Sequence, residues 1–278
     1  MLVTEVLAPE PVRAPLPPLP GGPLAVADAG IARARLHVLD GPKAFFGGVG
    51  FVMGTPRVWP YAAVPVAILF ALGATSAALG LWASWHLVSS IVSGASAWAE
   101  AGRWLLEILV GGVALVAAVL VAFAFAQPLS GFALEAISER QERALGGAGE
   151  HPKPRFFDNL LRSLAVNLLG LAVGLPLMAG LTVVELAFPA AAVVTWPLKL
   201  AASALLLAWD VLDYPLGLRG VGVGERLRFF ARNFWTLLGF GIFGAPLLLV
   251  PGLGLLLLPF GVAGATRLVV RSERSENA

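Results

Sequence analysis

Two charged residues, Glu185 and Lys199, stand inside otherwise apolar runs of this 278-residue chain. A charge within lipid is costly and usually has a function, so these two residues could form an ion pair beside a water-filled path. Alternatively, Glu185 lies at the outer turn of a helical hairpin, and Lys199 reaches toward the membrane surface beside Trp196. The sequence leaves both interpretations open.

Two carboxylates, Asp210 and Asp213, end an apolar run just before a basic loop. A proton-coupling role for Asp213 is one interpretation. The structural alternative is a helix end, because Pro215 disfavours helical geometry at Tyr214, with the carboxylates serving as a cap or as partners of loop arginines. The candidate arginines are Arg219, Arg226 and Arg228.

Signatures of enzymes and metal centres are missing from the sequence. His37, His86 and His151 are far apart, no serine stands in a GxSxG elbow, and no lysine follows a phosphate-binding glycine loop. The chain has no cysteine, which excludes disulfides and thiolate chemistry. We therefore expect no enzymatic activity, no cofactor and no metal site.

The composition is that of a protein whose solvent is the lipid bilayer. Hydrophobic residues make up 58% of the chain, charged residues 13%, and the mean hydropathy is +0.83. Soluble domains carry about 25% charged residues, so a chain of this length could not hide so much apolar surface from water. The net charge of +2 gives no reason to expect nucleic-acid binding.

Two long uncharged runs predict a pair of transmembrane helices. The first, 58–99, has a 21-residue centre at 62–82 with tryptophan or tyrosine on both sides, and the second, 108–134, has 27 residues. About 20 residues cross a bilayer, and aromatic residues favour its interfaces. We expect these helices to form an antiparallel pair.

Two later regions predict broken helical hairpins. The first, 163–209, is interrupted by Asn167, Pro176 and Pro197, and the second, 234–266, turns at Pro251-Gly252. The second hairpin has arms of roughly 25 and 18 Å, against a hydrocarbon core of roughly 30 Å. It either enters the bilayer without crossing it or crosses with ragged ends. The predicted fold class is an all-α, polytopic helical membrane protein with two long transmembrane helices and two broken hairpins.

Three segments are expected along the chain: a disordered, Pro/Ala-rich cytoplasmic tail at 1–42, a helical membrane domain at 43–272, and a polar tail at 273–278. The membrane domain would open with an interfacial helix at 44–55. Gly50 and Gly54 of this helix are spaced to let another helix approach closely.

The placement of lysine and arginine predicts the topology. Of 19 such residues, five lie at or before Arg57, five from Arg140 to Arg162, four from Arg219 to Arg232, and three from Arg267 to Arg274. Since basic loops favour the cytoplasm, three out-and-back excursions would leave all four clusters and both termini on the cytoplasmic side.

The order of several motifs resembles that of the CysZ sulfate permeases and the related etoposide-induced membrane proteins, over about 45–270. The motifs are Pro65, the segment 128–135, Asp213-Tyr214-Pro215, Arg232-Asn233, Phe240-Gly241 and the closing segment 262–266. The resemblance implies that Asp213, Tyr214, Pro215, Arg232 and Asn233 are family-motif residues with a structural role.

The resemblance also implies an inner-membrane protein that passes sulfate or a similar oxyanion. In that family, two arginines just before the first long helix hold the anion, but Trp59 and Pro60 fill those positions here. Arg57 stands two places earlier, and with Thr55 it is the expected anion contact, since arginine and helix starts both favour oxyanions. The alternative is a non-transporting scaffold or lipid-organising protein, in which Arg57 anchors the interface. A homo-oligomer is expected.

Overall fold

A computed structural model describes residues 35–92, 96–147, 156–249 and 253–276, and helices dominate these segments. Five of the helices in these segments are long and apolar enough to cross a membrane. The predicted fold class, a polytopic helical membrane protein, is therefore confirmed. In chain order the elements are α2 (Asp40–Gly54), η1 (Pro56–Val58), α3 (Trp59–Ile91), α4 (Ala97–Ala144), α5 (Phe156–Ala187), η2 (Pro189–Ala191), α6 (Ala192–Leu218), α7 (Val223–Arg232), α8 (Phe234–Gly241), η3 (Ala245–Leu249) and α9 (Leu253–Glu276).

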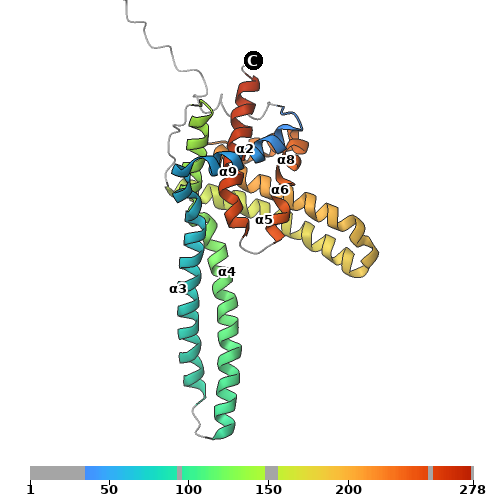
Figure 1. The fold of residues 1–278 in the computed structure, drawn as a ribbon. Helices are drawn as coiled ribbons and strands as arrows, with labels where there is room; N and C mark the ends of the chain where they lie inside the picture. Colours follow the sequence, from blue (N-terminus) through green and yellow to red (C-terminus); the bar gives the residue numbers. More distant parts are fainter. Residues whose placement is uncertain (1–34, 93–95, 148–155, 250–252, 277–278) are drawn as a thin grey trace, which may run out of the picture.

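The helices α3 and α4 form the predicted antiparallel pair, which projects well beyond the rest of the molecule (Figure 1). With 33 and 48 residues, they reach about 50 and 72 Å. Small residues line their contact: Gly80 faces Ala114, and the Ser76 hydroxyl donates to the Ala118 carbonyl at 3.2 Å. Such residues let two backbones approach closely, which is how helices associate without a hydrophobic driving force.

The helices α5 and α6 form a second hairpin, which leaves the body at a steep angle to the α3–α4 pair (Figure 1). Pro176 and Pro197 lie inside continuous helices, and the break falls at Phe188 and η2 instead. The interruptions expected at these prolines are therefore not present. Membrane helices tolerate proline because neighbouring helices and local adjustments satisfy the freed backbone groups.

The C-terminal hairpin is broken in its first arm only, because α9 continues through Pro259. Its first arm consists of α8, which has eight residues, then a bend and η3, whereas its second arm, α9, has 24 residues. About 12 Å of helix in α8 cannot cross a hydrocarbon core of about 30 Å, but about 36 Å in α9 can. The expected turn at Pro251-Gly252 lies outside the described residues.

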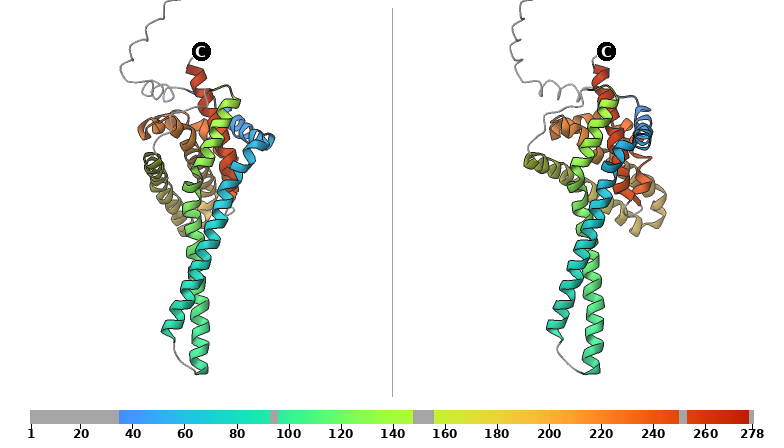
Figure 2. Two further views of the ribbon diagram at one scale, coloured as in Figure 1. Left: turned by 90° about the vertical axis from the view of Figure 1, so that its left-hand side faces the viewer. Right: turned by 60° about the vertical axis from the view of Figure 1, so that its left-hand side comes forward.

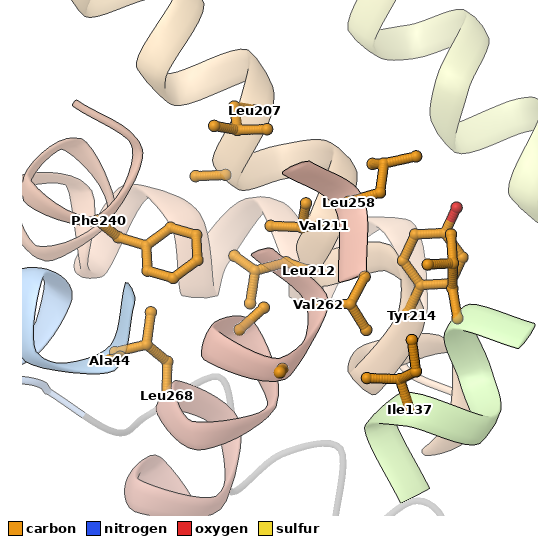
Figure 3. Packing of buried hydrophobic residues seen from close by; sticks show 14 of the residues in the cluster. Ala44, Ile137, Leu207, Val211, Leu212, Tyr214, Phe240, Leu258, Val262 and Leu268 are labelled. Carbon is orange, nitrogen blue, oxygen red and sulfur yellow. The ribbon is translucent and has the colours of Figure 1, made fainter. Parts of the chain in front are cut away.

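The core lies where α2, α4, α6, α8 and α9 meet, away from the tip of the α3–α4 pair (Figures 2 and 3). Phe240, Leu212, Val262 and Leu268 interdigitate there, and each is at most 2% exposed. In the most apolar 18-residue stretch of α9, 72% of the residues are buried, whereas in the corresponding stretch of α3 only 6% are buried. Protein therefore surrounds α9, while lipid is left to cover most of α3.

The first helix packs through different glycines from those predicted. A Cβ atom on Gly48 would lie 2.4 Å from the Gly264 backbone nitrogen, whereas Gly50 and Gly54 have no heavy atom within 4 Å of that position. The prediction of a close contact at Gly50 and Gly54 is wrong, because Gly41 and Gly48 lie on the face of α2 that meets α8 and α9. The expected tail at 1–42 lies largely outside the described residues, and α2 begins at Asp40.

The Asp-Tyr-Pro motif lies inside α6 rather than at its end. The helix continues through Pro215 to Leu218, so the expected departure from helical geometry at Tyr214 is wrong. Burial of Tyr214 and the residues around it outweighs the local preference of a residue before proline. The helix ends instead at Leu218, where Gly220 just beyond it has φ +73° and the Val221 amide donates to the Leu216 carbonyl at 3.0 Å.

Candidate functional site

The start of α3 holds the two residues expected to contact an anion. Arg57 is exposed on η1, next to fully buried Val58, and has no hydrogen-bond or ion-pair partner within the described part of the chain. Thr55, just before η1, makes no side-chain capping bond. The Trp59 indole donates to the Val52 carbonyl at 2.9 Å and so fixes the corner between α2 and α3. This bond holds the corner, while the exposed Arg57 guanidinium is available to a ligand.

A second arginine, Arg140 of α4, reaches the same helix start. Its Nη2 donates to the Tyr61 hydroxyl at 2.9 Å, and its guanidinium carbon lies 4.0 Å from the centre of the Tyr61 ring. Guanidinium groups bind oxyanions in bidentate fashion, so Arg140 adds chemistry of the type that Trp59 and Pro60 cannot supply. Sequence reasoning missed it, because the two contacting residues are 79 positions apart. The only available signal was the expected antiparallel pairing of the two long helices.

Glu185 and Lys199 meet near the tip of the α5–α6 hairpin. They form an ion pair, and Glu185 also accepts hydrogen bonds from the Trp196 indole at 3.1 Å and from the Thr195 hydroxyl at 3.4 Å. Each charged side chain is 26% exposed. Figure 1 shows the tip of this hairpin away from the start of α3, so the structure does not join this pair to Arg57.

The carboxylate Asp213 pairs with a loop arginine, as one interpretation of the sequence held. Its partner is Arg226 of α7, whose Nε also donates to the Val221 carbonyl at 2.9 Å. Both side chains of the pair are at least 90% buried. The pair therefore holds α7 against the end of α6.

A second buried cation, Arg219, connects three helices. It bonds Glu142 of α4 at 3.1 Å and Glu273 of α9 at 2.5 Å, and its Nη1 donates to the Pro215 carbonyl at 3.0 Å. Arg219 and Glu142 are each 4% exposed. The ends of α4, α6 and α9 are thereby held together at one end of the molecule.

Among the remaining motif residues, Asn233 also joins two elements. Asn233 accepts a hydrogen bond from the Leu36 amide at 2.8 Å and donates to the Phe229 carbonyl at 3.0 Å. Tyr214 packs in the core, and Arg232 is exposed in the last turn of α7. The structural role that the resemblance implied for these residues stays a prediction.

A cavity of about 800 Å³ opens between α4, α5, α6 and α9 and contains an unusual polar contact. Both oxygens of the Asp210 carboxylate accept from the Gln127 amide nitrogen, each at 2.7 Å. The rest of the lining is mostly apolar, including Leu171, Leu206 and Leu255. Gln127 and Asp210 are 83 positions apart, and no pattern in the sequence connects them. Within the described segments, no group of three or more His, Asp or Glu side chains could hold a metal ion.

Comparison with known proteins identifies the family. The family described as "Sulfate transporter CysZ/Etoposide-induced protein 2.4" matches residues 44–259. The chain belongs to this family. Its curated relatives include the protein named "Sulfate transporter CysZ" of Pseudomonas fluorescens (strain Pf0-1), which is 26% identical over 249 residues, covering 86% of this chain and 96% of the relative.

Two further relatives of this family carry the same name. The protein of Pseudomonas syringae pv. tomato is 32% identical over 162 residues, which cover 57% of this chain and 62% of the relative. The protein of Pseudomonas paraeruginosa is 26% identical over 247 residues, which cover 86% of this chain and 97% of the relative. The family resemblance drawn from the motifs is thereby confirmed.

Proposed function

We propose that this protein carries sulfate or a similar tetrahedral oxyanion across a bacterial inner membrane. Family membership and the names of the relatives support this function. The observation that carries the proposal is at the start of α3, where exposed Arg57 has no partner in the described part of the chain. Arg57, Thr55 and Arg140 would contact the anion, the two guanidinium groups by charge-assisted hydrogen bonds.

The proposed orientation has both termini in the cytoplasm. It is supported by the contacts of Arg219, which join the basic ends of α4, α6 and α9, and by the ion pair of Arg271 with Asp40, which adds the start of α2. Four basic segments thus lie at one end, and basic residues favour the cytoplasmic side.

Sulfate flux into liposomes that hold the purified full chain tests the function. We expect Arg57→Ala and Arg140→Gln each to lower the flux about tenfold, since a hydrogen bond to a charged group contributes about 1.5 kcal/mol or more. Arg228→Ala is the matched control, because Arg228 is exposed on α7 and makes none of these contacts. Equal flux in all three variants would contradict the proposal that the start of α3 binds the anion.

A non-transporting scaffold or lipid-organising protein is the second candidate. It is favoured by Trp59 and Pro60, which stand where the resembled family has two arginines. A complete lack of sulfate flux from the wild-type protein, in liposomes where a relative is active, would select this candidate.

We also propose that the protein assembles as a homo-oligomer. Chemical cross-linking of the full chain in native membranes would yield a ladder of multiples of 28.9 kDa. A single band at the monomer mass under these conditions would contradict the assembly.

A further inference from the structure

A basic pocket lies where α2 crosses α9, beside the end of α4. Its volume is about 310 Å³, and its charged lining consists of Lys43, Arg267, Arg271, Arg274 and Asp40. Four cations against one carboxylate leave a formal charge of +3. We use the name α2–α9 pocket for this site.

The fold itself brings these cations together. Arg267, Arg271 and Arg274 stand four and three residues apart on α9, so they share one face of that helix. The close crossing at Gly48 and Gly264 brings α2, and with it Lys43, against this face.

The side chain of Arg267 depends on a glycine of α2 for its position. A Cβ atom on Gly47 would lie 2.5 Å from the Arg267 Nε and 2.8 Å from its Cζ. The guanidinium therefore lies directly over Gly47. The three atoms nearest to such a methyl group, at 2.5 to 3.1 Å, all belong to this flexible side chain.

The protein satisfies only part of this positive charge. Arg271 bonds Asp40 at 3.1 Å, and Arg274 donates to the Leu145 carbonyl at the end of α4. Neither Lys43 nor Arg267 has a hydrogen-bond or ion-pair partner among the residues that the structure describes. Two converging cations are thus left to an external anion.

We propose that the α2–α9 pocket binds a tetrahedral oxyanion, either a free sulfate or phosphate ion or the phosphate group of an anionic lipid. Arg267 offers paired N–H donors and Lys43 a point charge, which together suit phosphate-like oxygens. The site is separate from the start of α3, because Lys43 and Arg57 lie near opposite ends of the 15-residue helix α2, which is about 22 Å long. The proposal goes beyond transport and does not depend on it.

Calorimetric titration of the full chain in detergent, with sodium sulfate and then sodium phosphate at constant ionic strength, tests the free-ion source. The variant is Lys43→Gln with Arg267→Gln, and the matched control is Arg35→Gln with Arg228→Gln, which removes two exposed charges outside the pocket. All proteins in the titration also carry Arg57→Ala, so that the start of α3 contributes equally little to each. Each missing pocket charge should raise the Kd about tenfold, so we expect about a hundredfold weaker binding in the pocket variant and no change in the control.

Thermal unfolding in nanodiscs of phosphatidylcholine, with and without phosphatidylglycerol, tests the lipid source. The anionic lipid should raise the unfolding midpoint of the wild type and the control, but not that of the pocket variant. If the pocket variant differs from the control only in the nanodisc experiment, the bound phosphate belongs to a lipid. If it differs only in the calorimetric titration, the ligand is a free ion. If the pocket variant and the control behave alike in both arms, the proposal is wrong.

A second variant keeps the test decisive if the double substitution does not fold. Gly47→Ala retains every charge of the pocket but displaces the Arg267 guanidinium. We expect about tenfold weaker oxyanion binding from this change alone. Gly50→Ala, with nothing within 4 Å of its added methyl group, is the control on the same helix. Both readouts measure binding, so the absence of sulfate flux would not affect the outcome.

Discussion

The charged side chains of this protein divide into those that hold helices together and those that face outward. Asp213, Arg226, Arg219 and Glu142 are buried and bonded to one another or to backbone carbonyls, whereas Arg57 is exposed. Removing a charge from water is costly unless its partners are well placed, so the buried groups depend on one another. An exposed cation carries no such dependence, and its substitution reports on ligands rather than on folding.

Loss of Arg219 is expected to destabilise the protein strongly. Arg219→Met removes the cation that bonds both Glu142 and Glu273, and breaking a buried ion pair costs about 3 to 5 kcal/mol. The measurement is the thermal unfolding midpoint in detergent, with exposed Arg228→Met as the control. Equal midpoints for the two variants would show that the Arg219 contacts do not hold the helix ends together.

The ion pair of Glu185 and Lys199 should behave as a coupled unit. A single Lys199→Gln or Glu185→Gln substitution leaves one unpaired charge on an apolar hairpin, whereas the double substitution leaves none. We therefore expect the double variant to be more stable than the less stable single variant, with a coupling between the two sites that favours the pair. Additive changes in a double-mutant cycle of unfolding free energies would contradict this. Sulfate flux through the same variants tests whether the pair also borders the ion path.

At the scale of elements, glycine determines how closely the helices of the basic end approach. Gly41 and Gly48 of α2 face the backbones of α8 and α9, and Gly241 of α8 faces that of α6. Each of these positions lacks room for a methyl group, because a Cβ atom there would lie within 2.4 Å of a neighbouring backbone atom. Backbone atoms cannot move aside as a flexible side chain can, so these crossings define the packing of α2, α6, α8 and α9.

Two alanine substitutions on α2 should therefore differ in their effect on stability. Gly48→Ala forces α2 away from α9 and should cost about 1 to 3 kcal/mol, as is common for overpacked cores. Gly50→Ala meets no atom within 4 Å and should be neutral or stabilising by up to about 1 kcal/mol, since alanine favours helix. The measurement is the unfolding midpoint of each variant in the same detergent. Destabilisation by Gly50→Ala and not by Gly48→Ala would instead support the close helix contact at Gly50 that the sequence predicted.

The sequence predicted the helices better than their contacts. Runs without charge located α3, α4 and both hairpins, because apolar length alone decides what a bilayer accepts. It did not reveal which glycines of α2 are covered, because Gly48 and Gly50 differ only in the face that they present to α9. Arg140 was missed for a similar reason, since its contact with Tyr61 depends on the register of α3 against α4. Proline was misleading inside α5 and α6, because both helices continue through their prolines, as membrane helices often do.

At the scale of the whole molecule, the distribution of charge and the overall shape both indicate the same orientation in the membrane. The basic ends of α4, α6 and α9 meet through Arg219, and the α3–α4 pair carries its tip far from them (Figure 2). The tip has tryptophans instead of a basic cluster: Trp82 and Trp85 on α3 and Trp98 on α4 are all exposed. Tryptophan favours the membrane interface and basic residues favour the cytoplasm, so the long pair should carry its tip to the outer side.

Cysteine labelling can test this orientation cleanly, because the natural chain has no cysteine. Ser96→Cys places a thiol at the exposed start of α4, at the tip of the long pair, and Ser275→Cys places one at the exposed end of α9. In intact spheroplasts, a maleimide that cannot cross the membrane should label Ser96→Cys and not Ser275→Cys, and after permeabilisation it should label both. The unsubstituted protein should stay unlabelled throughout. Labelling of Ser275→Cys in intact spheroplasts would invert the topology, and it would put the α2–α9 pocket on the side from which sulfate arrives.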